Sequence, residues 1–194
     1  MRGRSDGERF TFRLTNAYAG SRVLYGPAYD AYSIIRTIQN ASGRAHISSV
    51  HINATVTEQH DQALIHKPKT ASTSDPGFAT QTSINVARGD TLDVRVPVQQ
   101  VDSGLTEVAH GSFVIPDSVR GNGELEVYPG RGYFYIRRPG TLDQAFAKLL
   151  KVPTGNDLVL EVRMRGMDHR MELVVPTSYA LKGEPAPVTL HLVS

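Results

Sequence analysis

The sequence predicts an all-β fold, an antiparallel β-sandwich with two short helices. Apolar and polar residues alternate over most of the chain, which is typical of half-buried strands. Turn-forming Gly, Asn and Asp residues separate these stretches at short intervals, as in many-stranded antiparallel sheets. Helices do not alternate regularly with strands, which disfavours a doubly wound α/β fold. A chain of 194 residues can bury a core without disulfides, and this one contains no cysteine.

The alternation predicts about ten or eleven strands. Phe10, Phe12 and Leu14 indicate a short first strand. The clearest strands contain four alternating apolar residues, and Ile47, of opposite parity, indicates a bulge before the first of them. These are residues 50–56, 92–98 and 158–164, and the shorter candidates are 62–66, 82–87, 107–115, 124–128, 133–137, 170–175 and 188–193.

Two segments have the periodicity of helices. Residues 28–39 form a broad apolar face and are followed by a stop at Asn40 to Gly43. Residues 141–151 begin with a capping box, in which Thr141 is the N-cap and Gln144 can reach back to the amide of Thr141. We expect this second helix to plug one end of a sheet or to cover one face.

The polar run 67–80 contains two prolines and has no periodicity, so it is predicted to be a linker or a long loop. It separates an amino-terminal β subdomain (1–66) with one helix from a carboxy-terminal β-sandwich subdomain (81–194) that contains the helix 141–151. The sequence leaves open whether these parts are separate subdomains.

Charge and hydropathy exclude several partners. Lys and Arg number 21 and Asp and Glu 19, and the small basic excess lies near the amino terminus without forming a clustered stripe. We therefore expect no nucleic-acid binding. No stretch approaches the roughly 20 apolar residues of a membrane span. The first residues have a basic start but no apolar region of a signal peptide, so the chain is either cytoplasmic or a piece of a longer exported polypeptide.

Histidines are the first candidates for chemistry. His46, His51, His60 and His66 fall within 21 residues, and histidine clusters can bind zinc or copper. On a strand, however, His46 and His51 would point to opposite faces. Surface histidines are favoured over a metal site.

Other catalytic or cofactor patterns are weak. His110 and Ser112 would share one side of a strand, but no G-x-S-x-G motif exposes a nucleophile. Glu124 and Glu126 would share a face and are interpreted as solvated. The glycines at 121–123 and 130–132 lack the context of a phosphate-binding loop. We predict no catalytic, cofactor-binding or metal-binding residue.

The segment 128–138 has the composition of a binding surface, because aromatic residues beside arginines suit carbohydrate, peptide or protein partners. An ordinary strand with Phe134 and Ile136 in the core is the alternative. The candidate partner-binding residues are Tyr128, Arg131, Tyr133, Tyr135, Arg137 and Arg138.

Several short motifs also follow one another in a familiar order. Arg88–Val94 is similar to a strand entry PGDxVxV, and Val114–Pro116 with Gly123–Val127 is similar to a strand pair IP…GxYxLxV. The stretch 141–150 followed by 156–162 resembles a helix SLDELIALLN leading to NDRLYVRL, and 175–179 resembles LPPSV. This order resembles the region downstream of the peptidase domain in bacterial SpoIVB-like exported proteins (peptidase family S55), and residues 10–14 and 28–39 resemble the segment directly after that domain.

The peptidase module of that family carries a glycine–histidine motif and a Gly-Ser-Gly nucleophile motif, and neither is present here. The resemblance therefore implies a non-enzymatic accessory or protein-interaction domain of an exported protein, located outside the cytoplasm, with any protease activity in a module that this chain lacks. The implied partner is a protein. A structural subunit of a larger assembly and a histidine- or metal-dependent hydrolase are the alternatives, and the oligomeric state is left open.

Overall fold

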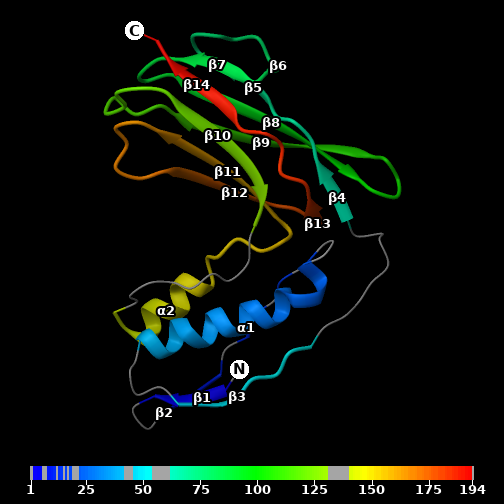
Figure 1. Cartoon of the computed structure of the whole chain (residues 1–194), viewed down its shortest axis with the longest axis vertical. Coiled ribbons are helices and arrows are strands. Elements are labelled where there is room, and N and C mark those ends of the chain that lie inside the picture. The colour runs from blue at the N-terminus through cyan, green and yellow to red at the C-terminus, as the bar shows by residue number, and fades with distance from the viewer. Residues whose placement is uncertain are drawn as a thin grey trace. The chain divides into compact units, whose positions relative to one another are not determined.

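The computed structural model describes residues 2–5, 8–11, 13, 14, 16, 18, 22–41, 46–53, 62–130 and 140–193. The chain divides into two compact units (Figure 1). Unit 1 comprises Met1–Thr57 and Gly130–Asn156, and unit 2 comprises Glu58–Pro129 and Asp157–Ser194. The described residues are mostly β-strands with two helices, which confirms the predicted fold class.

Unit 2 is a sandwich of two sheets. In the first sheet, β8 pairs with β9 on one edge and with β4 and β5 on the other, and these two pair in turn with β13 and β6. The second sheet has the order β12-β11-β10-β14-β7. The strands of the first sheet are β4 (Gln62–Ile65), β5 (Lys69–Ser72), β6 (Ala79–Thr80), β8 (Thr91–Gln100), β9 (Thr106–Val114) and β13 (Ala180–Lys182). Those of the second are β7 (Ser83–Val86), β10 (Gly123–Pro129), β11 (Asp157–Met164), β12 (Met171–Pro176) and β14 (Val188–Leu192).

β4 and β5 act as one strand interrupted by a bulge. Ile65 lies opposite Val98, whereas Lys69 lies opposite Arg95, so the stretch between them holds one extra residue. The buried Pro68 lies in this stretch, where the missing N–H of proline leaves no gap in the regular ladder.

The sandwich contains two parallel pairs, β13 with β4 and β14 with β7. Two chain segments, 62–86 and 180–192, thus run in the same direction and both pass from the first sheet to the second. The predicted antiparallel arrangement is therefore incomplete. Apolar–polar alternation could not reveal this feature, because parallel and antiparallel strands alternate their side chains alike.

Both sheets contribute alternating side chains to one core, which includes Leu92 and Val94 of β8 and Leu158, Leu160 and Val162 of β11. The two layers approach closely at Gly111 of β9. A Cβ atom at this position would lie 2.8 Å from Cδ2 of Leu173 and 2.9 Å from Cδ2 of Leu160. A side chain at this position would therefore require both leucine side chains to shift.

The polar run 67–80 is not a linker in this structure. It lies within unit 2, where it includes β5, β6 and the turn between them. The run looks polar because two of its buried side chains are hydroxyls with partners. Ser72 Oγ donates to the carbonyl of Asn85 at 2.7 Å, and Thr70 Oγ1 accepts from Gln81 Nε2 at 3.1 Å. Hydroxyl groups that have hydrogen-bond partners can be buried in a core, so a strand that carries them lacks the usual apolar–polar alternation.

Unit 1 joins two helices and a three-stranded sheet from both of its segments. The sheet has the order β2-β1-β3, and α1 packs against α2. Ile34, Ile38 and Leu149 form the buried centre of its core, and Ile47 and Phe146 pack against them. The elements are β1 (Arg2–Ser5), β2 (Glu8–Thr11), α1 (Arg22–Ala41), β3 (His46–Ser49) and α2 (Leu142–Leu149).

A buried carboxylate connects three segments of unit 1. Asp30 of α1 accepts hydrogen bonds from Asn16 Nδ2, at 2.7 Å, and from the Tyr18 hydroxyl. Asn16 in turn accepts from the backbone N–H of Gly155, which follows α2, at 2.8 Å. Hydrogen bonding to several donors makes it possible to bury this acid.

The predicted helix cap of α2 is confirmed with one change. Thr141 Oγ1 accepts from the N–H of Gln144 at 3.2 Å, as an N-cap does. The Gln144 side chain accepts instead from the N–H of Gly140, at 2.9 Å, one residue before the expected amide. By its contacts α2 belongs to unit 1, with the amino-terminal segment, and not to the sandwich.

The strand expected at 50–56 is shifted. β3 ends at Ser49, and residues 50–53 have no regular secondary structure. Residues 54–56 and the strand predicted at 133–137 lie outside the described residues. The alternation that predicted this strand thus continues beyond Ser49, the last residue of β3 that pairs with β1.

Candidate protein-interaction site

The outer edge of β9 is the longest unpaired strand edge in the described part of unit 2. β9 pairs with β8 through nine consecutive residues, and no described strand pairs with its other side. The other edges are shorter: β12 has six residues, β7 four, β13 three and β6 two. An unpaired edge presents free N–H and C=O groups that can pair with another chain.

The backbone hydrogen bonds establish which residues of β9 face this edge. The N–H of Gln100 donates to the carbonyl of Leu105 at 2.9 Å, and the N–H of Ile115 donates to the carbonyl of Asp90 at 2.8 Å. Odd-numbered positions therefore bond toward β8, because the bonding direction alternates along an antiparallel strand. The even-numbered residues direct their N–H and C=O groups outward, and they are Thr106, Val108, His110, Ser112 and Val114.

The side chains at these positions do not block the edge. Val108 is 47% exposed and Val114 is 63% exposed, and His110 and Ser112 are also exposed. β9 contains no Lys, Arg or Pro, the residues that commonly protect an edge from pairing. By contrast, β12 ends at Pro176 and carries an ion pair at Glu172.

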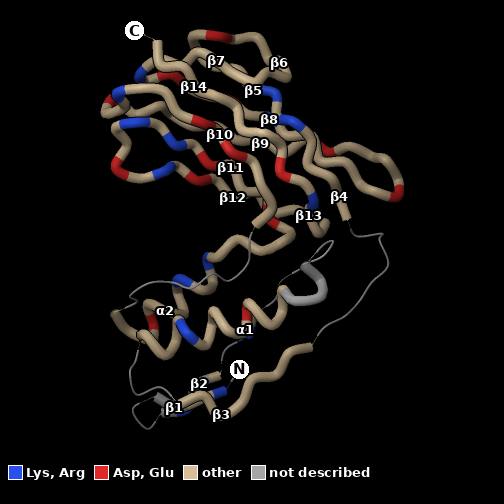
Figure 2. Tube along the Cα trace, in the orientation of Figure 1, with Lys and Arg blue, Asp and Glu red and all other residues tan. Residues whose placement is uncertain are grey.

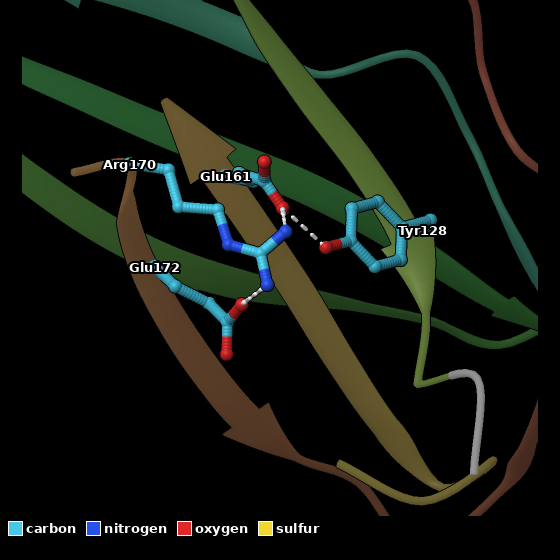
Figure 3. Close-up of polar contacts among 4 residues, drawn as sticks. All are labelled: Tyr128, Glu161, Arg170 and Glu172. Atoms are coloured by element: carbon cyan, nitrogen blue, oxygen red, sulfur yellow. Dashed lines mark hydrogen bonds and ion pairs between the residues drawn. The ribbon is translucent and has the colours of Figure 1, made fainter. Parts of the chain in front are cut away.

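A second polar cluster lies on the outer face of the second sheet (Figure 3). The Tyr128 hydroxyl of β10 donates to Glu161 Oε2 of β11 at 2.6 Å, and Arg170 Nη1 donates to the same oxygen at 3.1 Å. Arg170 Nη2 also lies 3.7 Å from Glu172 Oε2. Glu161 is buried, whereas Arg170 is exposed, so one buried carboxylate is held by a tyrosine on one side and an arginine on the other.

The cluster favours the neutral form of Tyr128. Burial, followed by the hydrogen bond to Glu161 and the charge of Glu161, raises the pKa of Tyr128 well above its usual range. A tyrosine with a raised pKa is a poor nucleophile or base, so Tyr128 stabilises the sheet as a hydrogen-bond donor. The partner-binding role expected of Tyr128 from the sequence stays a prediction.

The remaining candidate residues of the aromatic–arginine segment are outside the described residues. These are Arg131, Tyr133, Tyr135, Arg137 and Arg138. The structure therefore places one of the six predicted partner-binding residues and brings it together with Glu161 and Arg170, which the sequence analysis did not single out. No sequence signal marks Glu161 as buried, because it alternates with core residues as a surface acid would.

The other described candidates for chemistry are surface groups, and His60 lies outside the described residues. His110 and Ser112 lie on the exposed side of β9, as their parity predicted, and Glu124 and Glu126 alternate with the core residues of β10. His66 lies 3.0 Å from Gln99 through Nε2. In the described ranges, no group of three or more His, Asp or Glu residues could hold a metal ion.

No helix among the described residues is long and apolar enough to cross a membrane. The chain matches no protein-family model, no curated protein and no solved structure.

Proposed function

We propose that unit 2 is a non-enzymatic protein-interaction module, which binds an extended segment of a partner protein along the outer edge of β9. The observation that carries the proposal is the nine-residue edge with outward N–H and C=O groups at alternate positions. Addition of a strand to an exposed sheet edge is a common mode of peptide recognition, in which the main chain provides affinity and alternate side chains provide specificity.

The side chains of β9 indicate the chemistry of the bound segment. The outward positions begin with Thr106, and the two valines that follow, Val108 and Val114, flank His110 and Ser112. A partner strand with β-branched or aromatic residues opposite the valines would gain cross-strand contacts of about 0.2–1 kcal/mol each. None of the outward positions carries an Asp, Glu, Lys or Arg side chain.

The experiment is selection of binders from a random decapeptide library displayed on phage, followed by affinity measurement with synthetic peptides. Val108→Lys and Val114→Lys should each weaken the selected peptides by about tenfold, because lysine on an edge disfavours strand pairing. Amide exchange should slow at the even positions of β9 when peptide is bound. The proposal fails if the peptides bind these variants as tightly as they bind the wild-type protein.

Leu64→Lys is the matched control. Leu64 of β4 is 40% exposed, but β4 is paired on both sides, with β8 and β13, and has no free edge to offer. This variant should bind the selected peptides as the wild type does. The same set also tests the assembly alternative: a structural subunit would form oligomers that Val108→Lys dissociates and Leu64→Lys does not.

A further inference from the structure

The fold divides the charge of the chain very unevenly. Unit 1 contains twelve Lys and Arg residues and four Asp and Glu residues, a net charge of +8. Unit 2 contains nine and fifteen, a net charge of −6, and the two together give the +2 of the whole chain. Figure 2 shows Asp and Glu positions spread along the strands of unit 2. The linear sequence hides this division, because the acidic stretch 58–129 separates the two basic segments of unit 1.

Part of the positive charge is concentrated on one face of the sheet in unit 1. Arg4 lies opposite Arg9 on one side and opposite His46 on the other, so three basic residues occupy one row across β2, β1 and β3. Arg2 lies opposite Thr11 in the next row.

This basic face is open to solvent. The described side chains on it, Arg2, Arg9, Thr11, His46 and Ser48, are all exposed. The opposite face is directed to the core, since Gly3 is buried and Ile47 packs against the helices.

We propose that the basic face of unit 1 binds the phosphate backbone of nucleic acid without regard to base sequence. Arginine together with Ser and Thr hydroxyls is the residue set that contacts phosphates in nucleic-acid complexes. A membrane surface would favour apolar side chains among the basic ones, and a protein interface would favour an apolar or aromatic centre; the described residues of this face include neither. The inference revises the expectation drawn from the linear charge distribution, and it does not depend on the β9 edge of unit 2.

The test uses the whole chain and a fluorescein-labelled oligothymidylate of about 20 nucleotides, with binding followed by fluorescence anisotropy between about 50 and about 200 mM salt. The wild type should bind at the lower concentration. Arg2→Gln combined with Arg9→Gln should weaken binding about tenfold and reduce the slope of log K against log salt by about 1.4, which is about 0.7 for each lost phosphate contact. Arg2→Lys with Arg9→Lys preserves the charge and should retain most of the affinity.

Arg163→Gln with Arg165→Gln removes the same charge from exposed positions of unit 2 and is the matched control. It should leave binding within about twofold of the wild type, because those residues belong to the acidic unit. The proposal is overturned if the wild type does not bind at low salt, or if the two glutamine pairs lose equal affinity. It is also overturned if polyglutamate or anionic vesicles displace the labelled strand as well as unlabelled oligothymidylate does.

Discussion

The two units differ in the size of their cores, their charge and their dependence on each other along the chain. Among the described residues, unit 2 buries twenty apolar side chains between two sheets, whereas unit 1 buries Ile34, Ile38 and Leu149 at the centre of a smaller cluster. Unit 2 is acidic and unit 1 is basic. Because hydrophobic stabilisation grows with the apolar area buried, we expect unit 2 to be the more stable of the two.

Because of the order of the segments, the folding of unit 1 depends on unit 2 more than the folding of unit 2 depends on unit 1. Pro129 and Leu158 lie opposite each other in the pairing of β10 with β11, so the folded sandwich holds the ends of the insertion 130–156 close together. Unit 2 needs only to accommodate this insertion as a loop. Unit 1, in contrast, must bring α2 back to α1 across residues 58–129, and a folded unit 2 lowers the entropic cost of that closure.

Leu160→Ala should therefore have the largest effect and should reach both units. Leu160 is fully buried in β11 and lies against Gly111 of the opposite sheet, so its truncation leaves a cavity and should cost about 3–5 kcal/mol. Chemical denaturation gives the loss, and hydrogen exchange read by mass spectrometry gives its location. Faster exchange is expected in α1 and α2 as well as in the sandwich.

Ile38→Ala is the reciprocal change. Ile38 is fully buried in the core of unit 1. The substitution should lower the stability of unit 1 by about 2–5 kcal/mol and accelerate amide exchange in the helices, while the amides of β8 and β11 keep their protection. Equal acceleration in both units would show that they unfold as one cooperative block, and the unequal dependence of the two units would then be wrong.

Glu161→Ala should have the next largest effect and lower the free energy of unfolding by about 2 kcal/mol. It removes a buried acceptor that serves both the Tyr128 hydroxyl and Arg170. Glu172 lies directly opposite Glu161 on β12 but is exposed, and its contact with Arg170 is 3.7 Å. Glu172→Ala should therefore change the free energy of unfolding by less than about 0.5 kcal/mol. If the two variants lost similar amounts of unfolding free energy, the burial of Glu161 would not explain its contribution to stability.

The sequence predicted the strands of unit 2 well, because their alternation reports one buried face directly. Leu92, Val94, Val96 and Val98 all enter the core as their parity requires. Polar strand residues with buried partners, such as Thr70 and Ser72, were not recognisable, since satisfaction of a hydroxyl depends on a neighbour distant in sequence. The assignment of α2 to unit 1 could not be predicted either. It depends on contacts with α1, and residues 58–129 of the other unit separate the two helices in the sequence.

The candidate sites were less predictable than the fold. The length of β9 was predicted closely, but the free edge depends on which strands pair with it, and pairing does not follow from alternation. Tyr128 was singled out from its composition, yet its hydroxyl partner Glu161 lies 33 residues away. The basic face of unit 1 requires the register Arg9–Arg4–His46, which brings together residues from three strands.

Thr141→Ala should have a smaller effect, confined to unit 1. It removes the N-cap of α2 and leaves the N–H of Gln144 without its acceptor, which should cost about 1 kcal/mol. Thr141→Ser retains the hydroxyl and should restore most of the loss. Exchange of the first-turn amides of α2 is the most direct measurement, and exchange that is unchanged in Thr141→Ala would mean that the cap does not stabilise this helix.

Tyr128→Phe should alter the alkaline end of the stability profile. The pKa of Tyr128 is raised in the folded chain, so the folded state retains the phenolic proton to higher pH than the unfolded state does. The stabilisation is then fully present below the unfolded pKa of about 10 and is lost as the pH rises above it. Denaturation midpoints measured on either side of that pH should fall more steeply for the wild type than for Tyr128→Phe. Tyr32→Phe, at a position 60% exposed on α1, is the control and should follow the wild-type profile. A Tyr128→Phe profile as steep as that of the wild type would show that the bond to Glu161 does not link proton binding to folding.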